Sequence, residues 1–113
     1  MLCALTVRRL KPGTFEDFKA ALRGGPIWPD PDAEPTPSGS PDAPEGWRQF
    51  YALRNVENED EVITFGFFDG SLDELRARQA AGGYGRRRQA TDPFVESKLV
   101  DGVYEVLAER SLR

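Results

Sequence analysis

The chain has 113 residues, of which 39% are hydrophobic and 30% are charged, and its formal net charge is −4. A chain of this length buries roughly two-thirds of the surface that its unfolded form exposes, which is enough for one hydrophobic core without disulfides or a structural metal. Because the sequence holds no histidine and a single cysteine, it excludes Ser-His-Asp and Cys-His nucleophiles, His-ligated zinc and His-ligated haem. We therefore expect one domain spanning residues 1–113.

The amino-terminal segment predicts a β-strand. Residues 2–10 are rich in strand-forming side chains, and residues 11–13 (Lys-Pro-Gly) then give a turn. The lone Cys3 in this strand is typical of a small buried apolar residue. The apolar run is too short, and too soon interrupted by arginines, for a signal sequence or a membrane span. We expect a cytoplasmic protein without a membrane partner.

A helix is predicted to begin after Thr14, which is a suitable N-cap residue followed by an acidic residue at the third helical position. Phe15, Phe18 and Leu22 then fall at helical spacing along one face. Two glycines and a proline at residues 24–26 end this helix.

Residues 26–46 interrupt the pattern with seven of the nine prolines of the chain. Proline removes backbone donors and fixes φ, so this segment is predicted to be an extended surface loop inserted into the domain. It carries five acidic residues and no basic one, which leaves 15 basic against 14 acidic residues elsewhere. Two interpretations stay open: a lid that carries Ile27 and Trp28 over a pocket, or a solvated connection.

The second half of the chain predicts two strands, two helical stretches and a final strand. Residues 47–56 and 61–68 are rich in strand-forming side chains and are expected to form a hairpin. Ser71 and Glu74 form a capping box that opens a helix, which ends at the glycines 82–83. A further helical stretch is expected to begin near Arg86 or at Pro93 and to end near residues 101–102. Residues 103–108 give the last strand.

The order of these elements is β-α-β-β-α-β, which is typical of an α+β, ferredoxin-like antiparallel sheet with helices on one face. The predicted strands carry apolar side chains at both parities, such as Phe50 beside Tyr51 and Phe67 beside Phe68. The helices provide apolar residues for one face only, so another surface must cover the second face. That surface belongs either to a second copy of the sheet, which gives a homodimer, or to a ligand such as RNA.

Residues 64–68 (Thr-Phe-Gly-Phe-Phe) partly resemble the RNP1 motif of RNA-binding RRM domains. Ile63 and Thr64, however, stand where that motif needs a basic residue and a glycine, and the first strand has no aromatic residue for a second stacking platform. Residues 86–88, three arginines, lack the spacing of a phosphate-binding loop and are typical of a solvated face. We therefore expect a homodimer and no nucleic-acid partner.

Four further segments carry a family resemblance together with the aromatic hairpin strands: residues 10–18 (LKPGTFEDF), 71–75 (SLDEL), 93–95 (PFV) and 103–106 (VYEV). In combination they resemble the antibiotic-biosynthesis-monooxygenase-like family of dimeric α/β barrels. The resemblance implies a homodimer with a pocket in each protomer between sheet and helices. Some members oxidise phenolic or quinol-like aromatic compounds with O₂ and neither flavin nor metal, so we expect no cofactor and no metal. Members that degrade haem use an axial histidine, which this chain lacks.

An oxygenase of this kind needs an apolar pocket, a base or hydrogen-bonding group, and a cation or amide to hold an anion. Regular strand alternation places Trp47, Tyr51 and Asn55 on one face, and we predict these three as catalytic residues. Their alternative roles are a loop anchor for Trp47, a core residue for Tyr51 and a turn residue for Asn55. The predicted substrate-binding residues are Arg54, Phe65, Phe67 and Arg8, with core or dimer contacts as the alternative for the two phenylalanines.

The leading functional hypothesis is a small-molecule pocket protein that acts as a cofactor-independent oxygenase of phenolic or quinol-like aromatic compounds. The alternative is a non-catalytic dimeric module that binds a ligand or a partner. A cavity that contains both a hydrogen-bond donor and a titratable group favours the enzyme, whereas a filled cavity favours the alternative.

Overall fold

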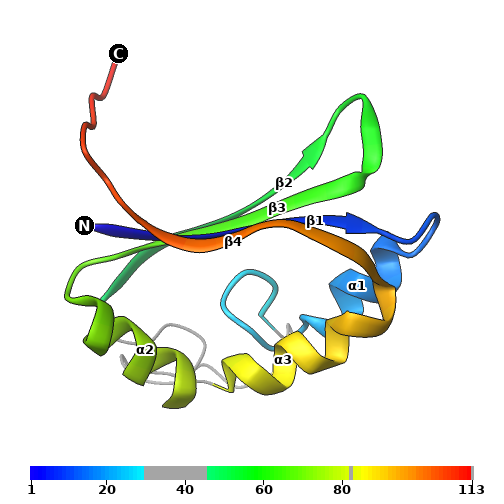
Figure 1. The fold of residues 1–113 in the computed structure, drawn as a ribbon, viewed down its shortest axis with the longest axis horizontal. Helices are drawn as coiled ribbons and strands as arrows, with labels where there is room; N and C mark the ends of the chain where they lie inside the picture. Colours follow the sequence, from blue (N-terminus) through cyan, green and yellow to red (C-terminus); the bar gives the residue numbers. More distant parts are fainter. Residues whose placement is uncertain (30–45, 82, 113) are drawn as a thin grey trace.

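The computed structural model describes residues 1–29, 46–81 and 83–112, so most of the predicted surface loop, residues 30–45, lies outside the described residues. The sheet contains four antiparallel strands in the order β2-β3-β1-β4, and the described α-helices lie beneath one face of it (Figure 1). The predicted α+β, ferredoxin-like arrangement is confirmed. The elements are β1 (Leu2–Leu10), α1 (Phe15–Ala21), β2 (Trp47–Asn55), β3 (Asn58–Phe68), α2 (Leu72–Ala81), α3 (Tyr84–Thr91), the 3₁₀ turn η1 (Asp92–Phe94) and β4 (Val95–Glu105).

The first turn of α2 shows how local sequence sets an element. The Glu74 backbone N–H donates to Oγ of Ser71 (3.2 Å), and the Ser71 backbone N–H donates to Oε1 of Glu74 (3.2 Å). The predicted capping box is therefore present. The start of α1 differs, because the Thr14 hydroxyl donates to the Lys11 carbonyl (2.7 Å) and makes no side-chain cap.

The last strand is longer than the sequence predicts. We expected a helix up to residues 101–102, whereas α3 ends at Thr91 and β4 already begins at Val95. Pro93 lies in the turn η1 between them, where its missing backbone donor stops the helix. The pairing of β4 with β1 contains two register shifts, and such bulges conceal the two-residue alternation of a strand from sequence reading.

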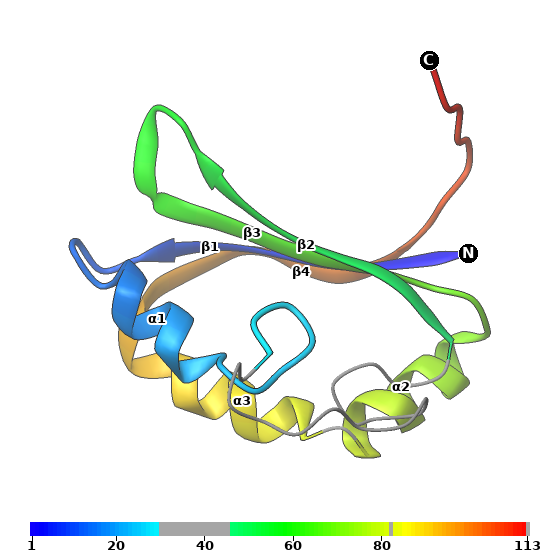
Figure 2. The same cartoon turned by 180° about the vertical axis from the view of Figure 1, so that it is seen from behind.

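The sheet has one buried and one exposed face. On the exposed face, Tyr51, Leu53 and Tyr104 keep 40%, 44% and 50% of their surface accessible. Figures 1 and 2 show that the described helices leave this face uncovered. Within the described ranges, the fully buried apolar residues all belong to the helix side: Leu10, Phe18, Val62, Phe68 and Leu75.

A β-bulge interrupts the alternation of β2. Trp47 lies opposite Phe68 of β3, whereas Gln49 lies opposite the immediately preceding residue of β3, so Arg48 is an extra residue in the ladder. The exposed Arg48 side chain forms an ion pair with Asp69 at 2.7 Å. One extra residue inverts the alternation of side chains between the two faces of a sheet.

The bulge separates residues that we predicted to share a face. The Trp47 ring lies 4.9 Å from the Phe50 ring, and both border the space beneath the sheet. Tyr51 instead stacks on Phe65 at 4.9 Å on the uncovered face. The prediction that Trp47, Tyr51 and Asn55 share one face is therefore wrong. It assumed regular strand alternation, and the sequence gives no sign of the bulge that breaks it.

Candidate functional site

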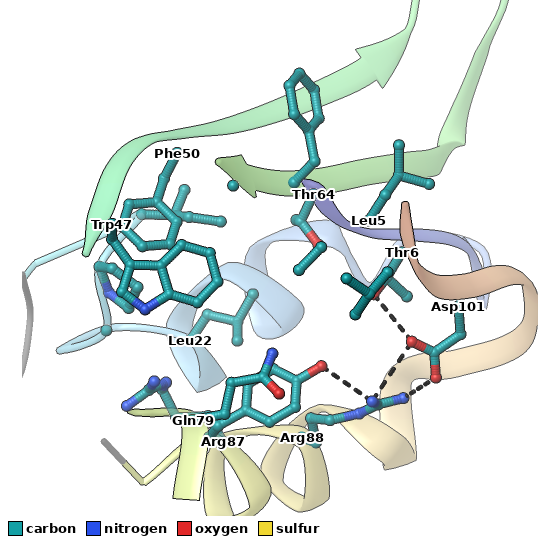
Figure 3. Close-up of a pocket in the computed structure, with 18 of the residues that line it drawn as sticks. Leu5, Thr6, Leu22, Trp47, Phe50, Thr64, Gln79, Arg87, Arg88 and Asp101 are labelled. Carbon is teal, nitrogen blue, oxygen red and sulfur yellow. Dashed lines mark hydrogen bonds and ion pairs between the residues drawn. The ribbon is translucent and has the colours of Figure 1, made fainter. Parts of the chain in front are cut away.

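A cavity of about 330 Å³ lies between the helix side of the sheet and the helices (Figure 3). Its described lining comes from all four strands, from α2 and α3, and from the segment that follows α1. Ile27 of that segment lines the cavity, whereas Trp28 packs edge-on against Phe15 with 6.4 Å between ring centres. The cavity is within the size range of small-molecule sites.

One wall of the cavity is aromatic. The rings of Trp47 and Phe50 are 4.9 Å apart and inclined by 32°. Both lie over Gly66 of β3, where an added Cβ would stand 2.7 Å from Cδ1 of Phe50 and 3.0 Å from Cζ3 of Trp47. Glycine therefore allows the two rings to approach the strand backbone. The result is an apolar surface on which a planar ligand can stack.

The facing wall is polar and is organised by one carboxylate. Asp101 of β4 forms an ion pair with Arg88 of α3 and accepts a hydrogen bond from the Thr6 hydroxyl at 3.4 Å. Arg88 also donates to the phenolic oxygen of Tyr84 at 3.0 Å. Because β4 and β2 are the two edges of the sheet, this wall lies across the cavity from the aromatic one (Figure 3). The Tyr84 oxygen accepts a hydrogen bond here, so its own proton is available to a ligand.

The pKa values of this ion pair follow from its surroundings. Partial burial acts to raise the pKa of Asp101, but the hydrogen bond and charge of Arg88 outweigh it and hold that pKa below its ordinary value. The hydrogen bond to Asp101 raises the pKa of Arg88, against a smaller opposing effect of burial. Asp101 is therefore ionised at neutral pH and accepts hydrogen bonds, not protons.

A buried guanidinium completes the described lining. Arg8 of β1 is only 4% exposed, and it borders the cavity. Its Nη1 donates to Oγ1 of Thr64 at 2.9 Å, and its guanidinium carbon lies 5.5 Å from the centre of the Phe18 ring. Burial lowers the pKa of Arg8, but an arginine remains cationic at neutral pH.

The predicted site residues divide between the two faces of the sheet. Trp47 and Arg8 lie at the cavity. Phe65 also borders it, but the Phe65 ring belongs to an aromatic cluster on the uncovered face with Tyr51 at 4.9 Å and Phe67 at 5.7 Å. The roles of these residues in binding or catalysis stay predictions.

The other two predicted residues lie near the turn of the hairpin. The Arg54 guanidinium stacks over the Phe15 ring at 3.8 Å. The Asn55 side chain donates to Glu61 at 2.6 Å and accepts from the Glu57 backbone N–H at 2.8 Å. Asn55 thus has the contacts of a turn residue, which is its alternative role. The structure does not bring all of the predicted residues into one site.

The polar wall was not among the predicted residues. Tyr84, Arg88 and Asp101 meet because α3 begins at Tyr84 and places Arg88 one turn later, facing β4. We expected residues 86–88 to form a solvated face, whereas Arg88 is half-buried. One available signal was Asp101, a charged residue inside the apolar run of residues 99–103, because charges within strands are normally paired.

Among the described residues, no group of three or more carboxylate or thiol side chains is placed to hold a metal ion. Burial raises the pKa of the Cys3 thiol, so this cysteine stays protonated at neutral pH. None of the helices in the described part of the chain has the length and apolar character needed to cross a bilayer.

The fold and the cavity together define a class: a ferredoxin-like α+β protein with a ligand-sized space between its sheet and its helices. Solved structures share this fold. "Putative antibiotic biosynthesis monooxygenase from Nitrosomonas europaea" superposes with a TM-score of 0.70 at 14% identity, over 96% of this chain and 100% of its own. A "putative Antibiotic biosynthesis monooxygenase" from Chloroflexus aurantiacus superposes with a TM-score of 0.67 at 12% identity, over 97% of this chain and 96% of its own.

Rv0793 from Mycobacterium tuberculosis also matches, with a TM-score of 0.67 at 17% identity over 97% of this chain and 98% of its own. Identities of this size show the fold alone. No protein-family model and no curated protein matches the sequence. The resemblance that the sequence suggested is thus confirmed at the level of the fold.

Proposed function

We propose that this chain is a small-molecule pocket protein of the antibiotic-biosynthesis-monooxygenase-like group, and that it oxidises phenolic or quinol-like aromatic compounds with O₂ and no cofactor. One observation carries the proposal: an aromatic wall faces a hydrogen-bonding wall across a cavity of about 330 Å³. Such a cavity stacks a ring on one side and orients its oxygen substituents from the other. The names of two structural neighbours, both antibiotic biosynthesis monooxygenases by name, support the same group.

The proposed reaction converts a phenol and O₂ into a quinone and water. One oxygen atom enters the ring, and the other leaves as water with two hydrogens of the substrate. The phenolic proton is released to solvent first, because the electron-rich phenolate transfers an electron to O₂ more readily than the neutral phenol, and it is taken up again when the second oxygen atom leaves as water. The chain contributes positioning: Trp47 and Phe50 stack the ring, and the Tyr84 hydroxyl, oriented by Arg88, donates to a substrate oxygen.

We propose a homodimer in which the uncovered sheet faces pack together. This face exposes Tyr51, Leu53, Val100 and Tyr104 by between 37% and 50%. Burying apolar surface stabilises an interface by about 25 cal/mol per Å², and sheet-on-sheet packing is a common way to do so. The carboxyl-terminal residues leave the sheet toward the same side (Figure 1), where Leu107 is 89% exposed.

A non-catalytic ligand-binding module is the second candidate. It is favoured by the state of Asp101, which its ion pair with Arg88 keeps ionised and therefore a weak proton acceptor. The same cavity would then bind an aromatic compound without transforming it. The cytoplasmic location expected from the sequence stays a prediction.

The test of the enzyme is O₂ consumption with a panel of phenols and quinols. We expect the native chain to turn over at least one of them, and Tyr84→Phe to lose about tenfold or more, since a hydrogen bond to a charged group contributes about 1.5–3 kcal/mol. Tyr104→Phe is the matched control on the other sheet face, since Tyr104 is exposed there and is not a predicted site residue, and it should stay within about twofold. Tyr51→Phe tests the site predicted from the sequence: a loss equal to that of Tyr84→Phe would move the site between the sheets. If the folded chain turns over no compound of the panel, the oxygenase is rejected and the non-catalytic binding module becomes the favoured function.

A further inference from the structure

The described lining of the cavity contains a buried cation, Arg8, that forms no ion pair with any described residue. Arg8 is 4% exposed, and its only hydrogen bond to the described residues goes to the neutral Thr64 hydroxyl. Its Nε is buried without a hydrogen-bond partner among those residues. Asp101, the one carboxylate among the described lining residues, is already paired with Arg88. A buried charge without a counter-ion is destabilising, and an anion beside it removes that cost.

The guanidinium is held in place for such an anion. Strand β1 fixes the Arg8 backbone, Thr64 accepts from Nη1 at 2.9 Å, and the Phe18 ring lies 5.5 Å from the guanidinium carbon. Because the Thr64 oxygen accepts this bond, its own hydroxyl proton is free to donate. Two donors from neighbouring strands, a guanidinium and a hydroxyl, therefore adjoin at one place on the cavity wall. Guanidinium groups pair well with carboxylate and other oxyanions.

The spacing along β3 relates the Arg8 and Thr64 donors to the aromatic wall. Thr64 and Gly66 are two residues apart and line the same cavity, which corresponds to about 7 Å along a strand. The rings of Trp47 and Phe50 lie over Gly66. An aromatic ring stacked on them can therefore reach Thr64 and Arg8 with an oxygen substituent.

We propose that Arg8 and Thr64 form an anion-binding site, and that the ligand of the cavity is an aromatic compound that binds with an ionised oxygen, either a phenolate or enolate or a carboxylate. This inference deepens the proposed function, since it names the charge state and the class of the compound that the cavity takes. It does not require turnover. The anion would pair directly with Arg8, on which Asp101 and Asp92 act only from beyond ion-pair distance.

The test is equilibrium binding of three probes that share one ring. 4-Nitrophenol ionises near neutral pH and changes absorbance when it does, 4-nitrobenzoate carries a carboxylate, and 4-nitroanisole stays neutral. We expect the native chain to bind at least one anion about tenfold or more tightly than 4-nitroanisole. If 4-nitrophenolate is the preferred anion, the pKa of bound 4-nitrophenol falls correspondingly. Preference for the phenolate indicates that the ligand of the cavity is a phenol or an enol, and preference for 4-nitrobenzoate indicates an aryl carboxylate.

Arg8→Met keeps an unbranched side chain and removes the charge. It should abolish the anion preference while 4-nitroanisole binds as before, whereas Arg9→Met, the same change at the exposed neighbour, should stay within about twofold of the native chain. If Arg8→Met fails to fold, the comparison of anionic and neutral probes on the native chain still tests whether the cavity prefers an anion. Equal binding of the neutral and ionised probes, no binding of either anion, or an anion preference that survives in folded Arg8→Met would overturn the proposal. Absence of O₂ consumption with the anion preference intact would overturn only the oxygenase.

Discussion

Replacing Gly66 by alanine tests whether the aromatic wall depends on the missing side chain. The added Cβ would lie 2.7 Å and 2.9 Å from two Phe50 ring atoms and 3.0 Å from a Trp47 ring atom. Carbon atoms prefer separations of about 3.5–4.0 Å, so the Phe50 ring must move by about 1 Å and the Trp47 ring by about 0.5 Å or more. Overpacking of this kind costs about 1–3 kcal/mol, and the lower entropy of the unfolded alanine chain offsets about 0.4–1 kcal/mol of it. We expect a net loss of about 1–2 kcal/mol.

Urea unfolding measures this loss as a lower midpoint at an unchanged slope. The displaced rings also enter the cavity, so affinity for the aromatic probes should fall in the same variant. Gly85→Ala is the matched control, because nothing lies within 4 Å of the Cβ added there and the position is helical. It should gain about 0.5–1 kcal/mol. A Gly66→Ala chain as stable as Gly85→Ala, with unchanged affinity, would refute the steric argument.

Two further substitutions test local interactions. Ser71→Ala removes the acceptor of the Glu74 backbone N–H and should cost about 1 kcal/mol of unfolding free energy; an unchanged urea midpoint would contradict the role of the capping box. Asp101→Asn removes the ion pair with Arg88, which should contribute about 1 kcal/mol or less, since the Asp101 side chain is 38% exposed. Because the folded-state pKa of Asp101 is lowered, this contribution is present at neutral pH and is lost as the pH falls below about 4. A stability difference between the native chain and Asp101→Asn that persists at low pH would contradict the pairing.

Local signals in the sequence predicted most of the fold. The capping box at Ser71 and Glu74 depends on residues three positions apart, and the apolar spacing from Phe15 to Leu22 predicts α1 correctly. The prediction failed for residues 95–102, where β4 pairs with β1 through two register shifts. Bulges add residues that break the two-residue period, so a strand that contains them has no regular alternation to read.

The candidate site was less accessible to sequence reading, because it depends on long-range pairing. Arg8 and Arg9 look equivalent in sequence, and only the sheet shows that Arg8 is buried while Arg9 is exposed. The bulge at Arg48 reverses the side to which Tyr51 points relative to Trp47. No local pattern encodes either outcome, since both follow from which strands lie side by side.

Fluorescence of Trp47 during ligand binding tests most directly whether the cavity is the functional site. The chain has two tryptophans. Trp28 is partly buried and packs against Phe15 beside the core cluster, so Trp28→Phe leaves Trp47, in the aromatic wall, as the sole tryptophan reporter. Nitroaromatic compounds quench a tryptophan that they stack on. We predict saturable quenching of Trp47 by the preferred anionic probe, with the same dissociation constant as calorimetry gives. Saturable binding by calorimetry that leaves Trp47 fluorescence unchanged would place the ligand elsewhere and contradict the account.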